Sequence, residues 1–265
     1  MHALSQLPPA LLNSISFSPT LCGLVLFGFA AGVGISAVGP GGVLATIGLY
    51  ALTALSPAQI AGTAIVTHVA TGTLGTAAYV HSGQLRDPAT RRTAGILAVA
   101  AVLGTPLGVL LNATLSGRIF GLLLGAFAAL IAILVWYRDR QPSFVAAAPS
   151  LVTLSTIGFL VAVASGLFGL GGPMLAVPLL VAVGQPILSA LAAAQAQSIV
   201  VASVGTIGYL VKGTIDWPLV AVVGLPELAG VLVGWIIARK VPTRKLKYTL
   251  IGTLLVLAPY LAWHG

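Results

Sequence analysis

Charged residues are scarce in this sequence: 6% of its 265 residues are Asp, Glu, Lys or Arg, whereas 58% are hydrophobic. A soluble domain carries about a quarter charged residues. Several apolar stretches also reach the roughly 20 residues that a helix needs to cross the hydrocarbon core of a membrane. The scarcity of charge therefore excludes an ordinary soluble domain and predicts an all-α, polytopic integral membrane protein.

The sequence also has only one cysteine and no basic segment at its N-terminus. The single cysteine, Cys22, excludes an intrachain disulfide and a Cys-rich metal cluster. The segment from Met1 to Ser18 contains no Lys or Arg, which indicates a short retained tail rather than a cleavable signal peptide. The sequence has no P-loop, metal-ligand cluster or paired acid motif, so it predicts no cofactor and no metal. The net charge of +8 comes from Lys and Arg in short connections, which indicates membrane topology rather than nucleic-acid binding.

Apolar segments follow one another in two sets of five, and the second member of each set is too short to cross a membrane unaided. The first set covers residues 19–38, 43–55, 57–81, 93–112 and 116–137, and the second covers 150–168, 173–184, 186–211, 217–238 and 243–263. Residues 138–149 carry two arginines, one aspartate and two prolines and are expected to connect the sets. We predict one transmembrane domain with a first membrane repeat at 1–140 and a second at 141–265.

Glycines keep their register between the two sets. Gly39-Pro40-Gly41-Gly42 returns as Gly169-Leu170-Gly171-Gly172, and Gly75-Thr76 returns as Gly205-Thr206 at the same shift in numbering. The pair Gly104-x-x-x-Gly108 returns as Gly230-x-x-x-Gly234 at a slightly smaller shift, which implies a short deletion in the second copy. This register predicts an internal repeat of about 130 residues.

Positive charge orients the two repeats. Parallel repeats would divide the twelve Lys and Arg six against six between the membrane faces, whereas inverted repeats leave ten on one face and Arg118 and Lys212 on the other. Because basic residues gather on the cytoplasmic side, the sequence predicts inverted repeats with both termini on the non-cytoplasmic side. The chain then has 8–10 membrane segments, including two short discontinuous or re-entrant helices after the glycine-rich breaks.

The paired glycine-rich breaks are the first candidate site. Breaks at equivalent places in inverted halves, each followed by a short apolar helix, are typical of a transporter's central binding site. Glycine lets a ligand approach the main chain, and the restarting helix offers N–H groups and partial positive charge to an anion. The alternative is close helix packing by small residues. The candidate substrate-binding residues here are Gly39, Gly41, Gly42, Gly169, Gly171 and Gly172.

Polar residues inside the apolar segments are the second candidate site, because they are costly in a membrane. His68 lies near the centre of its segment, in a stripe formed by Thr63, Thr67 and Thr71. Its repeat mate, Ser198, is flanked by glutamines, and the group predicted to bind substrate is Thr67, His68, Gln195, Gln197 and Ser198. Glu227 is the one carboxylate well inside a segment, and His68 and Glu227 are candidates for proton coupling. The alternative is interhelical hydrogen bonding that only stabilises the fold.

The second break and its surroundings resemble the TauE/SafE family of sulfite and sulfonate exporters, whose repeated motif is a glycine-rich run followed by a proline. The resembling residues run from Gly169 to Pro178 and from Pro57 to Thr63, and the resemblance covers nearly the whole chain. Pro173 and Val43 replace the third glycine of the motif. The resemblance implies a multi-pass cell-membrane transporter, not an enzyme, that moves sulfite, sulfonate or sulfoacetate-like anions.

Three alternatives remain open at this point. An anion channel would share the composition but lack coupling to a gradient. An intramembrane enzyme would need a nucleophile and a base, for which Ser165 and His68 are the candidates, although their spacing does not establish contact. The small-residue stripe Gly117, Gly121 and Gly125 serves either internal helix packing or a homodimer interface. The expected partners are the lipid bilayer and a small anion, without nucleic acid.

Overall fold

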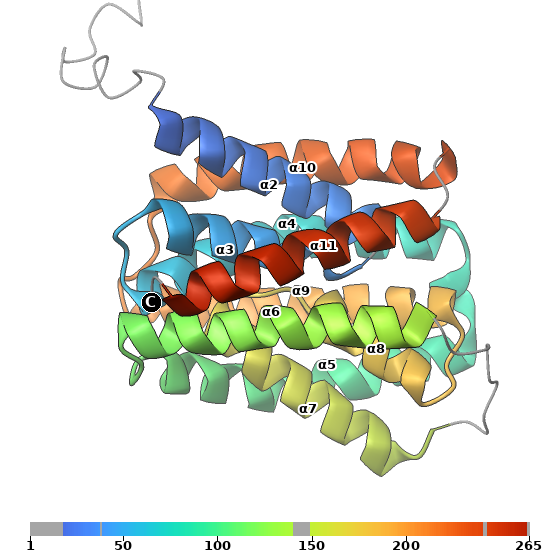
Figure 1. The fold of residues 1–265 in the computed structure, drawn as a ribbon. Coiled ribbons are helices and arrows are strands. Elements are labelled where there is room, and N and C mark those ends of the chain that lie inside the picture. The colour runs from blue at the N-terminus through green and yellow to red at the C-terminus, as the bar shows by residue number, and fades with distance from the viewer. Residues whose placement is uncertain (1–17, 38, 140–148, 241–242, 264–265) are drawn as a thin grey trace, which may run out of the picture.

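The computed structural model describes residues 18–37, 39–139, 149–240 and 243–263. The expected N-terminal tail, residues 1–17, and residues 140–148 of the expected connection lie outside the described residues. Within the described ranges the regular structure consists of α-helices and two short 3₁₀ helices. Figure 1 shows them as one bundle of elongated helices. The predicted all-α class is confirmed.

The helices follow the predicted segments closely. In the first half they are α2 (Pro19–Ala37), η1 (Pro40–Gly42), α3 (Val43–Leu52), α4 (Pro57–His81), η2 (Gln84–Arg86), α5 (Pro88–Asn112) and α6 (Gly117–Asp139). In the second half they are α7 (Leu151–Phe168), α8 (Pro173–Ala182), α9 (Ile187–Val211), α10 (Trp217–Lys240) and α11 (Thr243–Trp263). The five α-helices of each half therefore correspond in order and in approximate length.

Local sequence explains where several helices begin. The side chains of Ser56, Asp87 and Ser150 each accept a hydrogen bond from a backbone N–H in the first turn of the following helix. Proline at the first helical position follows two of these caps, at Pro57 and Pro88, where its missing N–H costs nothing. These signals fix the starts of α4, α5 and α7 at the ends of the bundle.

Six of the described helices are long and apolar enough to cross a membrane: α2, α5, α6, α7, α9 and α10. Their outward side chains are apolar, and Val99 and Leu103 on α5 are each 67% exposed. Such a surface suits lipid rather than water. Helix α4 has 25 residues but is not one of these six helices, because His68 and the threonines of α4 lower the mean hydropathy of the helix. The chain is a multi-pass membrane protein.

Helices α2 and α3 pack against each other as an antiparallel hairpin. Close contacts join Gly23 to Leu52, Phe27 to Gly48 and Gly34 to Gly41, so the two helices run antiparallel and the end of α3 returns toward the start of α2. Helix α3 has 10 residues and is about 15 Å long, half the thickness of the hydrocarbon core. In Figure 1, α3 lies toward one end of the bundle and α8 toward the other.

The halves pack against each other with pseudo-twofold regularity. Helix α2 packs on α10, and its counterpart α7 packs on α5. A Cβ on Gly230 would lie 2.2 Å from the carbonyl oxygen of Phe29, and a Cβ on Gly104 would lie 2.7 Å from that of Phe159. Gly230 is the repeat mate of Gly104, and Phe159 is the repeat mate of Phe29. The repeated glycines therefore allow close helix approach at equivalent places.

The equivalent helices α4 and α9 run in opposite directions. On α4 and α9, Gly62 lies against Tyr209 and Gly75 lies against Gln195, which makes these two helices antiparallel. Figure 1 also shows α6 beside α11. An antiparallel relation between counterparts is the one that inverted repeats require. The division at residue 140 and the orientation in the membrane stay predictions.

The small-residue stripe on α6 is partly used inside the protein. Gly121 and Gly125 are buried, whereas a Cβ on Gly117 would meet no atom within 4 Å. Helix α11 packs along α6. Internal packing therefore accounts for two of the three glycines, and a homodimer stays a prediction.

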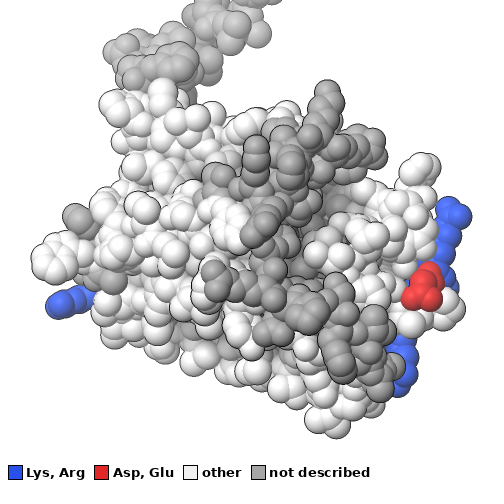
Figure 2. All heavy atoms as spheres, turned by 45° about the vertical axis from the view of Figure 1, so that its right-hand side comes forward, with Lys and Arg blue, Asp and Glu red and all other residues white. Residues whose placement is uncertain are grey.

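Labelling from the two sides of the membrane tests the predicted orientation. Figure 2 shows basic side chains at two opposite edges of the described surface with uncharged surface between them. We expect Arg86→Cys and Lys212→Cys, each in a Cys22→Ser background, to react with an impermeant thiol reagent from opposite sides. Cys22 must be removed because it is exposed. Labelling of both positions from one side would contradict inverted repeats.

Candidate functional site

The two glycine-rich breaks give the backbone conformations that end one helix and start the next. Gly39 has φ 104° and precedes η1, and Gly169 has φ 73° at the C-terminus of α7. Such positive φ angles favour glycine. No side chain caps the N-terminus of α3 or of α8. Each break therefore places a helix N-terminus inside the bundle without a capping side chain from the break itself.

Helices α4 and α9 cross between the breaks. His68 and Ser198 are each the twelfth residue of a 25-residue helix. Gly72 allows the crossing, because a Cβ there would lie 3.3 Å from the Oγ of Ser198. Ser198 also accepts a hydrogen bond at 3.3 Å from the backbone N–H of Gly172 in the second break. The crossing thus brings the middle of both helices to the break region.

One small cavity lies where these elements meet. Its lining residues come from α2, both breaks, α4, α8 and α9, and are Ile35, Gly39, Gly42, His68, Thr71, Gly171, Pro173, Met174, Gln195 and Ser198. The volume within which the centre of a water molecule could lie is about 10 Å³. That is close to the minimum that holds one water. The cavity is therefore small, and its lining residues include neither Lys nor Arg.

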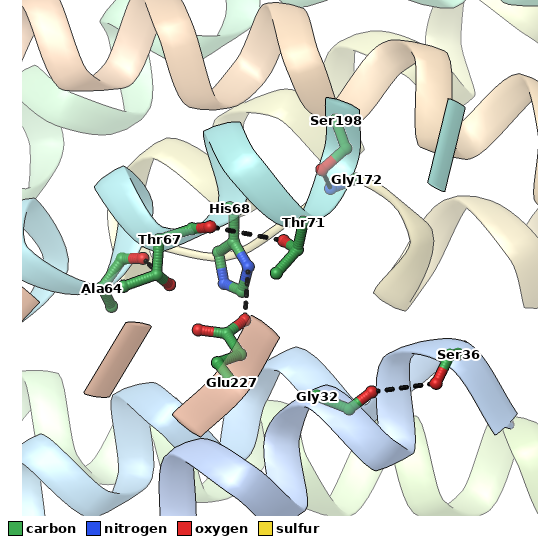
Figure 3. A network of polar contacts seen from close by, with 9 residues as sticks. All are labelled: Gly32, Ser36, Ala64, Thr67, His68, Thr71, Gly172, Ser198 and Glu227. Atoms are coloured by element: carbon green, nitrogen blue, oxygen red, sulfur yellow. Dashed lines mark hydrogen bonds and ion pairs between the residues drawn. The ribbon is translucent and has the colours of Figure 1, made fainter. Parts of the chain in front are cut away.

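His68 contacts the one intramembrane carboxylate among the described residues. Nδ1 of His68 lies 3.2 Å from Oε1 of Glu227, and the two side chains are 1% and 0% exposed (Figure 3). This distance is within the range of an ion pair, although the two groups are not aligned as a hydrogen bond. Nε2 of His68 and both carboxylate oxygens of Glu227 have no hydrogen-bond partner. On the other side of the ring, a Cβ on Gly42 would lie 2.9 Å from Cε1. The imidazole thus connects α10 with the first break.

Six of the residues predicted from sequence line the cavity: Gly39, Gly42, His68, Gly171, Gln195 and Ser198. Gly172 adjoins it through its hydrogen bond to Ser198. Four others do not line it. Gly41 and Gly169 lie against the backbones of Gly34 and Ala61, Thr67 lies against Gly224, and Gln197 donates a hydrogen bond at 3.0 Å to the carbonyl oxygen of Gly158.

Four lining residues were not among the predicted site residues. Thr71 belongs to the predicted polar stripe, and its position one turn after Thr67 could have identified it. Pro173 directly follows the second break. Ile35 and Met174 are apolar residues in apolar helices, so no sequence signal marks them. Ser165, the nucleophile of the enzyme alternative, does not line the cavity that contains His68.

The fold and the site define a polytopic membrane transporter. Its described helices form two sets that correspond in order and approximate length, and two glycine-rich breaks meet at a small cavity inside the bundle, as is typical of transporters with internal repeats. The model of the family described as "Sulfite exporter TauE/SafE" matches residues 24–261, nearly the whole chain. The chain belongs to the TauE/SafE family. The comparison with curated proteins found no match, and neither did the comparison with solved structures.

Proposed function

We propose that this protein is a secondary transporter that moves small sulfur-containing anions across the cell membrane. The anion, sulfite, a sulfonate or a sulfoacetate-like compound, binds between the two repeats near the membrane midplane. Family membership supports transport of such anions. The observation that carries the proposal is the convergence of both glycine-rich breaks with His68 and Ser198 on one buried cavity.

Uncharged donors and helix N-termini account for anion recognition in this cavity. Each helix N-terminus carries about half a positive charge and free N–H groups. Ser198 adds a hydroxyl, Gln195 an amide, and His68 the unpartnered Nε2. A sulfur oxyanion presents several acceptor oxygens to such a surrounding shell of donors. Recognition without a lysine or arginine also leaves the anion free to dissociate on either side.

The small size of the cavity favours a transporter over the alternative anion channel. A conducting channel needs a continuous water-filled path, whereas the space beside His68 holds about one water. Movement of the halves relative to each other would have to open the cavity to one side at a time, which is alternating access.

Flux into liposomes tests this function. We expect purified, reconstituted protein to accumulate sulfite and methanesulfonate with saturable kinetics, and to transport acetate more slowly because a planar carboxylate offers fewer acceptor oxygens. Protein-free liposomes measure leakage, and planar-bilayer recording measures channel currents. Absence of flux for every sulfur oxyanion would contradict the proposal, and stepwise unitary currents would replace it with a channel.

A further inference from the structure

The contact between His68 and Glu227 requires an explanation beyond anion binding. Both side chains are almost completely buried, and neither Nε2 of His68 nor either oxygen of Glu227 has a hydrogen-bond partner. An ionisable residue at this depth is costly, and breaking such a pair leaves an uncompensated buried charge. A merely structural role would be filled at lower cost by apolar residues of similar volume.

The helix packing holds Glu227 in place. A Cβ on Gly32 of α2 would lie 1.9 Å from the backbone oxygen of Glu227, and Gly224 on the preceding turn lies against Thr67 of α4. Glycines thus let α10 approach both α2 and α4 closely, which fixes the backbone from which the carboxylate extends. The geometry positions the acid against one imidazole nitrogen while the first break lies against the other side of the ring.

The other described titratable or charged groups on the elements around this imidazole are engaged elsewhere. The elements packed on α4 are α3, α5, α7, α9, α10 and η2. Tyr50 of α3 and Tyr209 of α9 donate hydrogen bonds to the carbonyl oxygens of Gly117 and Gly166, and α7 carries no titratable residue.

The remaining groups of this kind lie toward the ends of the helices. Lys212, after α9, donates a hydrogen bond to the carbonyl oxygen of Val109, and Asp216, before α10, accepts one from the backbone N–H of Leu219. The others are the exposed residues His81, Arg86, Asp87, Arg91 and Arg92, and the half-buried Tyr79. The charge of the His68–Glu227 pair therefore depends mainly on its own protons.

The pair also breaks the symmetry of the two halves. The repeat mate of His68 is Ser198, and the mate of Glu227 is Ala101. Ala101 is fully buried. Each half thus supplies one member of the pair, and at the equivalent positions the other half has a neutral hydroxyl in place of the imidazole and a methyl group in place of the carboxylate.

We propose that His68 and Glu227 form a proton-binding pair that must hold a proton before the cavity accepts an anion. The transporter then moves a proton together with each anion. This inference rests on the proposed function and names its coupling ion. It assigns Glu227 as a positioning and proton-holding residue that acts through His68, while His68 itself contacts the anion.

The charge states of the pair give the coupling its direction. With neutral imidazole and ionised Glu227 the pair carries one negative charge, which repels an anion in a cavity whose lining contains no Lys or Arg. One added proton makes the pair neutral, and the imidazole can then donate from Nε2 to the anion while Nδ1–H faces Glu227. Because linkage is reciprocal, the anion strengthens proton binding by the same factor by which the proton strengthens anion binding.

Equilibrium binding across a pH series tests the pair. The probes are methanesulfonate, whose charge is constant over this range, and sulfite, applied to purified protein from about pH 5 to about pH 9, the range that brackets histidine titration. We expect the dissociation constant of the parent protein for methanesulfonate to rise with pH, by up to about tenfold per pH unit, with uptake of about one proton per anion from weakly buffered solution. Glu227→Gln should bind methanesulfonate with a dissociation constant that does not follow pH.

Asp87→Asn is the matched control, because it removes an exposed carboxylate that caps α5 and should keep the pH dependence of the parent. Proton uptake by the parent protein needs no variant, so the test survives if Glu227→Gln does not fold. A pH-independent dissociation constant and no proton uptake in the parent would overturn the proton-binding pair while leaving anion transport intact. Failure of the parent to bind either probe would instead overturn the proposed function.

Discussion

Gly171→Val is expected to abolish anion binding in protein that still folds. A Cβ at this position would lie 3.1 Å from the Oγ of Ser198 and 3.5 Å from Cγ of His68, and valine adds two further methyl groups. Those methyl groups fill a cavity that has room for about one water and cover the donors that the anion needs. We expect a loss of affinity for methanesulfonate of about 100-fold or more, equivalent to about 2.8 kcal/mol, measured by equilibrium binding.

Gly252→Val provides the matched control. Gly252 lies in α11, where a Cβ meets no atom within 4 Å, so the same substitution should leave binding and thermal stability close to those of the parent. Parental affinity in a folded Gly171→Val variant would show that the second break serves only helix packing.

Gly41→Val differs from Gly171→Val in its expected result, although the sequence predicts both glycines to be substrate-binding residues. A Cβ on Gly41 would lie 2.3 Å from the backbone of Gly34, so the substitution pushes α2 and α3 apart. Overpacking of this kind costs about 1–3 kcal/mol or more. Thermal unfolding of the detergent-solubilised variant should show this loss of stability before any effect on the anion site can be measured.

His68→Ala is the second substitution with a large expected effect. It removes the one side chain that joins the cavity to Glu227 and leaves a buried carboxylate without its partner. We expect affinity for methanesulfonate to fall about 100-fold or more at every pH, equivalent to about 2.8 kcal/mol. His68→Gln keeps a hydrogen-bonding group but cannot take up a proton and leaves Glu227 in place, so it should bind better than His68→Ala and worse than the parent, with the largest loss at high pH, where an ionised carboxylate repels the anion. Equilibrium binding measures both effects.

Two further variants make the result on His68 specific. His81→Ala removes an exposed histidine from the end of the same helix and should behave as the parent does. The double variant His68→Ala/Glu227→Gln removes the uncompensated carboxylate, and it should stay impaired because the imidazole donor is still missing. Recovery of binding in the double variant would mean that His68 acts only by neutralising Glu227. Parental binding and transport by His68→Ala at every pH would make His68 a structural residue.

More of the fold than of the candidate site can be predicted from the sequence. Helix boundaries follow from apolar length and from caps such as Ser56, and the repeat follows from glycines whose equivalent contacts the structure contains. Hydropathy gives the length of α2 and α3, whereas their packing against each other is known only from contacts such as that of Gly34 with Gly41. Helix direction is a property of tertiary packing.

Some residues that the sequence predicts to bind substrate lie away from the cavity, because the prediction did not separate the faces of each helix. Gln195 and Gln197 are two positions apart, and since each residue turns a helix by about 100°, their side chains diverge by about 200°. Gln195 lines the cavity, and Gln197 instead donates to Gly158 on α7. The same argument separates Thr71, which lines the cavity, from Val69.

The His68–Glu227 contact could not be derived from the repeat. Its two members lie in different halves of the chain, and the repeat pairs them with Ser198 and Ala101 rather than with each other. Each was identifiable as an ionisable residue inside a membrane helix. Their proximity depends on α10 packing against both α2 and α4, which the glycines Gly32 and Gly224 allow.

A structure of the protein with bound methanesulfonate tests the central claim most directly. We predict density for the sulfonate between the two glycine-rich breaks, with its oxygens within hydrogen-bond distance of Nε2 of His68 and Oγ of Ser198. Sulfonate bound outside this cavity, for example beside the exposed Arg91 and Arg92, with the cavity still closed, would contradict the assignment of the breaks as the transport site.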